Sequence, residues 1–488
     1  MELAVSNPES ARRIARLPAK VRRVHLVGVA GSAMAALAGM FAQRGFEVSG
    51  SDEQFYEPAG SMLRRLPIQL KQGFSADHLT PPPDLAVIGN VITRDNVEAR
   101  AVLERGIPYL SMPEALSHFF LADRIALAVT GTHGKSTSTA LMAYALYRAG
   151  RKPSMLLGGV AKDFASNYRL DSGAHFVVEG DEYDTAFFDK GPKFMHYRPA
   201  AMILTGVEFD HADIYRDLAQ VKSAFRALAE SLGPEAVLAV CADSAAALEV
   251  TENSRARRVT FGLAAGEVRA ADLRLGPSGA RFSVVRDGIK ATDDLLLGIG
   301  GRMNVANALG VYVLLERLGI DSEALATGFA SFQGVARRQE VVAEAGGVTI
   351  IDDFAHHPTA VRATLSALAP RFPGRRLVAA FEPRSNTARR RTFQAEFASA
   401  FDQAAVVFLA PVYFKPNDPI PPEERLDVAA LAREISARGS HAAAASSLDD
   451  LASRLSSELR PGDVVVLMSN GPFGGLAARL AGALASRP

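Results

Sequence analysis

The segment from Ile125 to Ala149 places the strongest constraint on the fold of this chain. The apolar run Ile125–Thr130 leads at once into a glycine-containing loop and then into a helical pattern at 136–149. A buried strand that passes through a short loop into a helix is typical of a parallel sheet with crossover helices. Short apolar runs alternate with amphipathic stretches along the rest of the chain, so we expect an α/β protein.

Apolar runs of this kind predict strands in three successive parts of the chain. Residues 32–44 predict a helix directly after the first strand, and the polar, glycine-punctuated residues 255–300 predict short antiparallel strands. The proline run 81–83 predicts a loop, because proline cannot pair inside a sheet. The predicted strands lie at 24–29, 46–49, 85–88, 125–130, 176–179, 202–205, 237–241, 348–351, 377–381, 406–409 and 464–468.

Chain length and these patterns predict three domains behind an N-terminal extension. At roughly 150 residues per domain, 488 residues correspond to about three domains. Residues 1–23 are rich in arginine and lack an apolar core, which excludes a secretory signal and predicts a solvated extension. The predicted boundaries give an extension at 1–20 and domains at 21–123, 124–335 and 336–488.

Composition and charge exclude several classes of protein. The formal net charge is +1, so no bulk field attracts nucleic acid or an anionic membrane. The single cysteine, Cys241, excludes an internal disulfide and a cysteine metal cluster, which fits a reducing cytoplasm. No apolar run approaches the roughly 18 residues of a membrane span. We therefore expect a cytoplasmic protein whose partners are small molecules held at local sites.

The loop from Gly131 to Ser136, with the sequence GTHGKS, is predicted to bind nucleotide phosphates. Its glycines let backbone N–H groups surround phosphate oxygens, and the following helix adds the positive end of its dipole. Lys135 can reach the outer phosphates, and the Ser136 hydroxyl can ligate Mg²⁺. Val129 stands where an ordinary phosphate loop has its first glycine, so this loop is a variant. A chance glycine turn is the alternative, and the flanking strand and helix favour the phosphate loop.

A second glycine turn follows the first predicted strand. Residues 28–32 match only part of the G-x-G-x-x-G pattern, because Ala30 stands where the second glycine would be. Such a turn can hold a pyrophosphate at a helix N-terminus, in a dinucleotide or in another nucleotide. Asp52 lies 24 residues after Gly28, where it either accepts from ribose hydroxyls or only closes the end of a strand.

Several motifs, taken in order, resemble those of the Mur ligases, which join amino acids or peptides to UDP-N-acetylmuramic acid. The resemblance covers about residues 21 to 485, and the order and spacing of the motifs make it specific. The motifs are TGTHGKS at 130–136, EGDEYD at 179–184, EFDH at 208–211, Asn304 with Asn307, Arg337-Arg338, and DDFAHHP at 352–358.

This resemblance implies both an architecture and a reaction. An N-terminal Rossmann-like domain would bind the UDP-sugar, a central P-loop ATPase-like mixed sheet would bind ATP, and a C-terminal Rossmann-like domain would bring in the amine. The reaction implied is ATP-dependent amide-bond formation through an acyl phosphate, with Mg²⁺ as the cofactor.

The resemblance also implies roles for individual residues. Lys135, Glu179, His211 and Arg338 would act in catalysis, and Ser136, Glu179 and His211 would ligate magnesium. ATP would contact Gly131, Thr132, His133, Gly134, Lys135, Ser136, Thr137, Asn304, Asn307, Arg338 and Asp353. The UDP-sugar would contact Gly28, Gly31, Ser32, Asp52, Asn90 and Thr93. The peptide would contact His356, His357, Arg384, Ser385, Asn386, Ser469 and Asn470.

Physical arguments support several of these assignments. Asn304 and Asn307 are three residues apart, which places both amides on one helix face, and amides pair well with an adenine edge. The planar fork of Arg384 suits a substrate carboxylate. The acidic residues of 181–184 are more tolerable beside cations than in isolation. Met303 stands where the family commonly has a histidine.

Three stretches are most similar to the family member that attaches the preformed tripeptide L-Ala-γ-D-Glu-meso-diaminopimelate during peptidoglycan recycling. They are EYDTAFFDK at 182–190, EPRSNT at 382–387 and MSNGPFGG at 468–475. The alternative is the sibling that adds free L-alanine, which usually has a His-Arg pair where this chain has Arg384-Ser385. A nucleotide-dependent switch would leave the C-terminal polar motifs unexplained, and a nicotinamide-dependent oxidoreductase would leave Glu179 and His211 unexplained.

Two further segments are predicted to lie outside the site. Some siblings use a carbamylated lysine after the histidine of the EFDH motif, and Lys222 is the nearest downstream lysine. We expect Lys222 on a helix face, away from the chemistry. The arginine run 389–391 is expected to form a solvated helix face.

Overall fold

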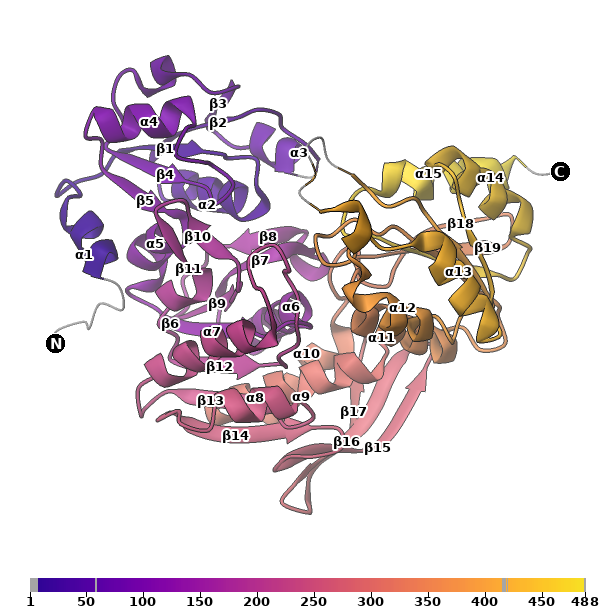
Figure 1. Ribbon diagram of the computed structural model, residues 1–488. Helices are drawn as coiled ribbons and strands as arrows, with labels where there is room; N and C mark the ends of the chain where they lie inside the picture. The colour runs from indigo at the N-terminus through magenta and orange to yellow at the C-terminus, as the bar shows by residue number, and fades with distance from the viewer. Residues whose placement is uncertain (1–7, 58, 415–417, 419, 487–488) are drawn as a thin grey trace. The chain divides into compact units, whose positions relative to one another are not determined.

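The structure is a computed structural model that describes residues 8–57, 59–414, 418 and 420–486 (Figure 1). The chain forms two compact units, and each is described by itself. The first unit comprises Met1–Val207, Ala219–Val268 and Gly310–Gly328. The second unit comprises Glu208–Leu218, Arg269–Leu309 and Phe329–Pro488. The domain boundaries predicted from the sequence remain a proposal.

A five-stranded parallel sheet forms the N-terminal part of the first unit (Figure 1). Its strands are β1 (Arg23–Val27), β2 (Glu47–Asp52), β3 (Gln69–Gln72), β4 (Leu85–Ile88) and β5 (Tyr109–Ser111), in the order β3-β2-β1-β4-β5. Connecting helices include α2 (Ser32–Gln43), α3 (Ala59–Arg64), α4 (Val97–Glu104) and α5 (Met112–Leu116). The strand order reverses between β1 and β4, and ligands of doubly wound sheets bind at the carboxyl ends of strands at such a point.

A second sheet of the first unit begins at β6 (Ile125–Thr130), which passes into α6 (Lys135–Arg148). The part of this sheet within the unit has the order β14-β13-β12-β6-β9-β7-β8. The pairs that flank β6 are parallel, and β7 and β8 form an antiparallel pair. The other strands are β7 (Ser154–Ala161), β8 (Ser166–Arg169), β9 (His175–Glu179), β12 (Ala201–Leu204), β13 (Val237–Cys241) and β14 (Arg257–Gly262). Further elements are the hairpin β10 (Asp184–Ala186) and β11 (Asp189–Pro192), and the helices α7 (Leu218–Ser231), α8 (Ala245–Val250) and α10 (Ser322–Ser331).

The second unit contains a six-stranded sheet in the order β18-β19-β23-β20-β21-β22. Its strands are β18 (Glu340–Ala345), β19 (Val348–Asp353), β20 (Leu377–Phe381), β21 (Val406–Leu409), β22 (His441–Ala444) and β23 (Val464–Met468). Side chains of α11 (Pro358–Arg371), α12 (Gln394–Ala400) and α13 (Val428–Ala437) share one apolar core with the sheet, and those of α14 (Leu448–Glu458) and α15 (Leu476–Ala485) share another. The sheet is parallel except for the edge strand β18, which is antiparallel to β19. Apolar cores on both of its faces make this part doubly wound, as expected for a Rossmann-like domain.

The polar region 255–300 differs from its prediction. Short antiparallel strands were expected, but β14 runs parallel to β13. The strands β15 (Val268–Gly276), β16 (Gly279–Arg286) and β17 (Ile289–Leu297) are nine, eight and nine residues long. β16 and β17 are antiparallel as expected. Many side chains of these long strands are exposed, so the apolar signal that marks a strand in the sequence is weak. Helix α9 (Arg302–Arg317) follows this region.

The prediction of a solvated N-terminal extension is wrong for the residues that the structure describes. Residues Pro8–Ala15 form helix α1, in which Arg13 is only 8% exposed. The Arg13 guanidinium donates from Nε and Nη2 to Glu114 Oε1, at 3.1 and 2.7 Å, and Glu114 is 1% exposed. The same guanidinium lies 4.8 Å from the centroid of the Phe188 ring. An arginine-rich helix is therefore packed against the first unit by a buried ion pair.

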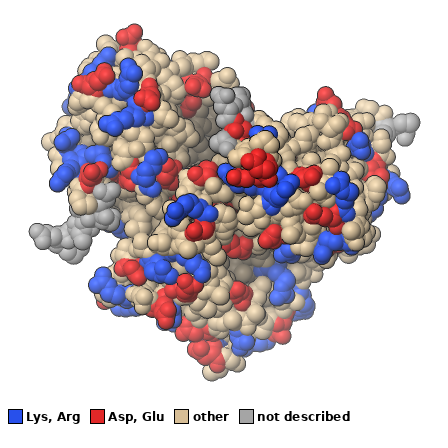
Figure 2. Space-filling model, viewed as in Figure 1, with Lys and Arg blue, Asp and Glu red and all other residues tan. Residues whose placement is uncertain are grey.

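Two further features concern membrane-spanning helices and the distribution of surface charge. Within the described residues, none of the helices combines the length and the apolar character that crossing a membrane requires. On the face drawn in Figure 2, basic and acidic side chains are mixed, which fits the formal net charge of +1.

A buried carboxylate in the first sheet predicts loss of stability in acid. Glu98 accepts hydrogen bonds from His25 Nε2 at 3.3 Å, from the Ser51 hydroxyl and from the Ser75 N–H at 3.1 Å. Burial alone would raise the pKa of Glu98, but these donors outweigh burial and lower it. A lowered pKa in the folded state contributes stability above the unfolded pKa of about 4.3, and this contribution is lost as the pH falls through the folded value.

We therefore expect Glu98→Gln to unfold more easily than the unchanged protein at pH 7 and to show a flatter dependence of stability on pH between about 3 and 5. Urea denaturation at a series of pH values measures both effects. Parallel pH profiles for the two proteins would contradict this account of Glu98.

Candidate active site

The predicted phosphate loop lies at the carboxyl end of β6, between β9 and β12. Gly131 has φ +122°, and a Cβ there would lie 2.3 Å from Thr205 Oγ1 and 2.8 Å from the Gly206 carbonyl oxygen. The Thr132 N–H donates to this same carbonyl at 2.9 Å. Gly134, with φ +80°, precedes the first residue of α6. Both glycines are thus required by backbone geometry, which holds the loop at a helix N-terminus where anions bind.

Lys135 is held by the loop and by a buried carboxylate. Its ammonium donates to the Gly131 carbonyl at 2.8 Å and to Glu182 Oε1 at 2.9 Å. Burial lowers the pKa of Lys135, but the negative charges of Glu182 and Asp181 outweigh burial and raise it. The lysine is therefore charged at neutral pH, and a nucleotide phosphate could take the place of the Glu182 carboxylate beside it.

Three acidic residues after β9 each form an ion pair with a lysine. Glu182 pairs with Lys135, with a closest distance of 2.8 Å. Asp181 pairs with Lys193 at 2.6 Å, and Asp184 pairs with Lys190 at 2.7 Å. Three neighbouring carboxylates are tolerated here because each has its own cation, as the sequence suggested.

Ser136 and Glu179 form a pair of oxygen ligands suited to magnesium. The Ser136 hydroxyl donates to Glu179 Oε1 at 2.9 Å, and the Gly158 N–H donates to Glu179 Oε2 at 2.7 Å. Burial raises the pKa of Glu179. The nearby donors and the Lys135 charge therefore do not fully offset the cost of burying its negative charge. Magnesium prefers hard oxygen ligands, and a divalent cation would stabilise this carboxylate. The residues present therefore fit the ion, and their role as its ligands remains a proposal.

The second glycine turn has a defined conformation at the carboxyl end of β1. Gly28 has φ +82° and donates its N–H to the Ser51 carbonyl at 2.9 Å. Asp52 accepts from the Ala30 N–H at 2.8 Å through Oδ2, so this carboxylate closes the turn, whatever role it has toward ribose. Gly31 precedes the first residue of α2, and the Ser32 hydroxyl donates to the Gly158 carbonyl at 2.9 Å.

Asn90 and Thr93 lie beyond β4, the neighbour of β1, and so close to this turn. The side chain of Ile92 lies next to Gly28, since a Cβ at Gly28 would be 3.1 Å from Ile92 Cγ1. Asn90 is half-buried and Thr93 is exposed. Asn96, which follows in the same loop, has a structural role, because its side chain accepts from the Glu98 and Ala99 N–H groups at the N-terminus of α4.

The predicted adenine and ribose residues belong to the second unit. Asn304 and Asn307 are buried on one face of α9, and the Asn307 amide donates to Asn304 Oδ1 at 3.4 Å. Asp353 ends β19 and accepts from the Gln339 N–H at 2.7 Å and from the Ala355 N–H at 2.8 Å. Burial raises the pKa of Asp353, and the nearby Arg338 charge opposes that shift.

His211, His356 and His357 gather around two acidic residues of the second unit. Asp210 Oδ1 accepts from the backbone N–H of His211 at 2.7 Å, and Asp210 Oδ2 lies 3.7 Å from His356 Nε2. Burial would raise the pKa of Asp210, but the neighbouring histidines, His356 above all, lower it well below its usual value. Nδ1 of His357 lies 3.7 Å from Glu208 Oε2 and accepts from the Thr359 N–H at the start of α11. The predicted magnesium role of His211 is not established by these contacts.

The predicted peptide residues other than His356 and His357 follow the carboxyl ends of the adjacent strands β20 and β23. Arg384 stacks on Tyr413, with 3.7 Å between the guanidinium carbon and the ring centroid, and Nη1 lies 3.6 Å from Glu382 Oε1. The Ser469 hydroxyl donates to the other oxygen of Glu382. Asn470 is half-buried beside Ser469. Glu382 thus joins two of the predicted residues, although the sequence did not single it out.

The arginine run 389–391 corrects a prediction. It was expected to form a solvated helix face, but Arg389 is 1% exposed. Its guanidinium pairs with Asp418 and donates to Asn386 Oδ1 at 2.7 Å. The Ser385 hydroxyl oxygen accepts from the Ala388 N–H at 3.0 Å in the same turn. Arg389 therefore supports the loop that carries two predicted peptide contacts.

Known proteins with similar sequences identify the family. Three family models match successive parts of the chain. The model described as "Mur ligase family, catalytic domain" matches residues 23–124. Those described as "Mur ligase middle domain" and "Mur ligase, glutamate ligase domain" match residues 129–315 and 337–471. The UDP-N-acetylmuramate–L-alanyl-γ-D-glutamyl-meso-2,6-diaminoheptandioate ligase of Escherichia coli (strain K12) is 37% identical over 468 residues, which cover 95% of this chain and 99% of that protein.

The chain belongs to the Mur ligase family. As a Mur ligase it uses ATP to form an amide bond. Another relative, the UDP-N-acetylmuramate–L-alanine ligase of Kineococcus radiotolerans, is 36% identical over 409 residues, or 83% of this chain and 84% of that protein. Among solved structures, a murein peptide ligase from Psychrobacter arcticus 273-4 is 29% identical, with a TM-score of 0.71, and the match covers 96% of this chain and 99% of that one.

Some contacts of this Mur ligase site had no signal in the sequence. Glu182 belongs to an acidic run in the sequence, but no local pattern predicts its ion pair with Lys135, which lies 47 positions earlier. Gly158 and Asn167 lie in a hairpin without any motif, and only the tertiary structure brings them to Ser32. Lys222 lies on helix α7, as predicted, and pairs with Glu249 at 2.6 Å.

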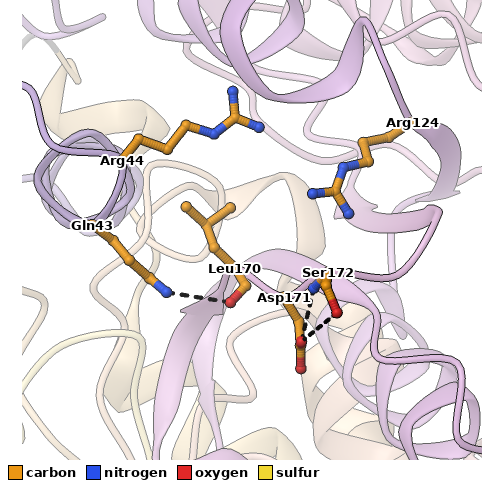
Figure 3. A pocket seen from close by; sticks show the side chains of 6 residues that line it. All are labelled: Gln43, Arg44, Arg124, Leu170, Asp171 and Ser172. Carbon is orange, nitrogen blue, oxygen red and sulfur yellow. Dashed lines mark hydrogen bonds between the residues drawn. The ribbon is translucent and has the colours of Figure 1, made fainter.

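A shallow hollow of the first unit lies apart from the predicted site residues (Figure 3). Its lining comes from the end of α2, the start of β6 and the segment after β8. The Gln43 amide donates to the Leu170 carbonyl at 3.3 Å, and Asp171 accepts from the Ser172 N–H at 2.7 Å. The Gln43 contact ties helix α2 to the segment that follows β8.

Proposed function

We propose that this Mur ligase joins the tripeptide L-alanyl-γ-D-glutamyl-meso-diaminopimelate to UDP-N-acetylmuramate, through an acyl phosphate, in peptidoglycan recycling. The choice of substrates rests on one observation. The chain is 37% identical to the Escherichia coli tripeptide ligase over nearly the full length of both chains. Arg384 supports it, because its planar guanidinium suits a carboxylate of the peptide. The proposed compartment is the cytoplasm, where ATP is available.

The proposed reaction proceeds in two steps. A carboxylate oxygen of the muramoyl group attacks the γ-phosphorus of ATP, the bond to ADP breaks, and an acyl phosphate forms. The uncharged α-amine of the tripeptide then attacks the acyl carbon. The tetrahedral intermediate expels phosphate, the nitrogen loses a proton, and an amide remains. Activation is needed because the oxygen of a free carboxylate is a poor leaving group.

This chain supplies positive charge and orientation for the first step. Lys135 would leave Glu182 and contact the outer phosphates, where negative charge develops during transfer. Magnesium, when bound by Ser136 and Glu179, neutralises phosphate charge. The N-terminus of α6 and the loop N–H groups would hold the β-phosphate. Arg338, Asn304, Asn307 and Asp353 are proposed to contact ATP, and His211 is proposed as a further magnesium ligand.

The second candidate function is addition of free L-alanine. A specific observation favours it, since the Kineococcus radiotolerans L-alanine ligase is 36% identical to this chain. The Arg384-Ser385 pair argues against it, because the alanine-adding siblings usually have His-Arg at these positions.

A direct competition assay tests the proposal. The enzyme is incubated with ATP, Mg²⁺ and UDP-N-acetylmuramate, and either the tripeptide or L-alanine is offered while ADP release and product mass are followed. We expect kcat/KM to be at least about 100-fold higher for the tripeptide, because a site built for several polar groups rejects a substrate that leaves them unpaired. A reaction without acceptor is the control. Efficient ADP release and product formation with alanine would overturn the proposal.

A further inference from the structure

The hairpin of β7 and β8 contacts helix α2, which begins directly after the UDP-sugar turn. Near the middle of the helix, a Cβ on Gly39 would lie 2.3 Å from the Tyr168 hydroxyl, so the tyrosine lies against the helix backbone. At the end of the helix, the Gln43 amide donates to the Leu170 carbonyl at 3.3 Å (Figure 3). These contacts leave the helix little freedom to move independently of the hairpin.

Asn167 of β8 makes the corresponding contact at the start of the helix. Its Nδ2 donates to the Ser32 carbonyl at 3.1 Å and to the Ser32 hydroxyl oxygen at 3.2 Å. Asn167 is 5% exposed, and its Oδ1 has no hydrogen-bond partner among the described residues. Buried amide oxygens are normally hydrogen-bonded, so this oxygen keeps the capacity to accept one more hydrogen bond.

Gly158 of β7 links Ser32 to the ATP loop. Its carbonyl accepts from the Ser32 hydroxyl at 2.9 Å, and its N–H donates to Glu179 Oε2 at 2.7 Å. The other oxygen of Glu179 accepts from Ser136 at 2.9 Å. One residue is therefore held from two sides, by the predicted sugar-nucleotide turn and by the predicted magnesium carboxylate.

We propose that Asn167 is a positioning residue for UDP-N-acetylmuramate, which acts through Ser32, and that Gly158 couples this turn to the ATP loop. The inference rests on the proposed function, because it takes the sugar nucleotide as the ligand of residues 28–32. A ligand that fixes Ser32 also fixes Gly158, and with it the orientation of the Glu179 carboxylate. By linkage, a nucleotide at the ATP loop must change affinity for the sugar nucleotide by the same factor as the reverse.

Calorimetric titration of the full chain tests this coupling. UDP-N-acetylmuramate is titrated in the absence and presence of a non-hydrolysable ATP analogue with Mg²⁺, and the ratio of the two Kd values is the coupling factor. The variants are Asn167→Ala and Asn167→Asp, which keeps the shape of the side chain but lacks the donor. Ser166→Ala is the matched control, because the Ser166 hydroxyl oxygen accepts from the Tyr168 N–H at 3.2 Å within the same hairpin.

In the unchanged enzyme we expect the analogue to tighten sugar-nucleotide binding at least about fivefold. Both Asn167 variants should raise the Kd and KM for UDP-N-acetylmuramate by about 5- to 10-fold and bring the coupling factor toward one. Their Kd for the ATP analogue alone and their KM for the tripeptide should stay unchanged, which a general loss of structure would not produce. Ser166→Ala should behave as the unchanged enzyme.

The outcomes separate the two proposals. Equal Kd values and equal coupling factors in the Asn167 variants and the unchanged enzyme would overturn this inference alone. Normal behaviour of Asn167→Asp would do the same, because it would remove the hydrogen bond as the cause. Absence of any binding of UDP-N-acetylmuramate to the unchanged enzyme would overturn the proposed function and this inference with it.

Discussion

Replacing Lys135 by alanine is expected to lower the rate of amide-bond formation by a factor of roughly 10³ or more while the fold persists. The Lys135 ammonium is the cation that the phosphate loop itself presents, and it contacts two loop carbonyls and the Glu182 carboxylate. Removing one preorganised electrostatic contact to a transition state typically lowers kcat by about 10²–10³. In phosphoryl transfer such contacts provide most of the catalysis, so we expect the upper end of that range or a larger effect.

The same substitution removes the lysine that pairs with a buried carboxylate. Glu182 is 2% exposed, and loss of the cation from a buried ion pair destabilises a protein. The double variant Lys135→Ala/Glu182→Gln removes that charge, so it should recover thermal stability but not activity. Stability is read from thermal unfolding, and activity from mass detection of product with all three substrates present. Turnover at the level of the unchanged enzyme in Lys135→Ala would contradict the role given to this lysine.

The second large effect is expected at Arg13, far from the phosphate loop. Arg13→Ala should destabilise the first unit by about 3–5 kcal/mol, because it leaves the buried Glu114 carboxylate without its cation. Glu114 also accepts from the Ser111 N–H at 2.8 Å, so this carboxylate cannot simply turn toward solvent. With roughly 2–4 °C per kcal/mol for a unit of this size, the melting temperature should fall by roughly 6–20 °C.

Arg12→Ala is the matched control for this prediction. Arg12 lies next to Arg13 on α1 but is exposed, and exposed substitutions usually change stability by less than about 0.5 kcal/mol. The double variant Arg13→Met/Glu114→Gln should recover part of the loss, since replacing both partners of a buried ion pair is often nearly neutral. Differential scanning calorimetry measures all three proteins. Equal melting temperatures for Arg13→Ala and Arg12→Ala would show that the N-terminal helix adds no stability.

The acidic partner of Arg13 gives this pair a defined pH dependence. Burial raises the pKa of Glu114, but the hydrogen bonds from Arg13 and the Ser111 N–H outweigh it, and the pKa is lowered overall. The ion pair therefore contributes its stability above the unfolded pKa of about 4.3 and loses it as the pH falls through the lower folded value. The melting temperatures of Arg13→Ala and the unchanged protein should accordingly converge in acid.

Buried parallel strands were predictable from the sequence almost to the residue. The strands Leu85–Ile88, Ile125–Thr130, Leu377–Phe381 and Val464–Met468 coincide with their predictions. Such strands are covered on both faces, so they appear as unbroken apolar runs. The exposed strands β15–β17 lacked that signal, and their length was missed. The glycine loop between β6 and α6 was predictable for a different reason, because its glycines are required by local backbone geometry.

The partners of the charged residues could not be predicted in this way. Arg13 and Glu114 are 101 positions apart, and Lys135 and Glu182 are 47 apart. Arginine and glutamate are usually exposed, so a sequence alone assigns them to the surface, as it did for the N-terminal extension and for Arg389. The amino-acid sequence by itself determined the α/β architecture, the glycine loop before α6 and the family, because these depend on local periodicity and on motif order. Only the tertiary structure decided which charges are buried and which loops share hydrogen bonds, because burial of a charge depends on a partner that folding brings from elsewhere in the chain.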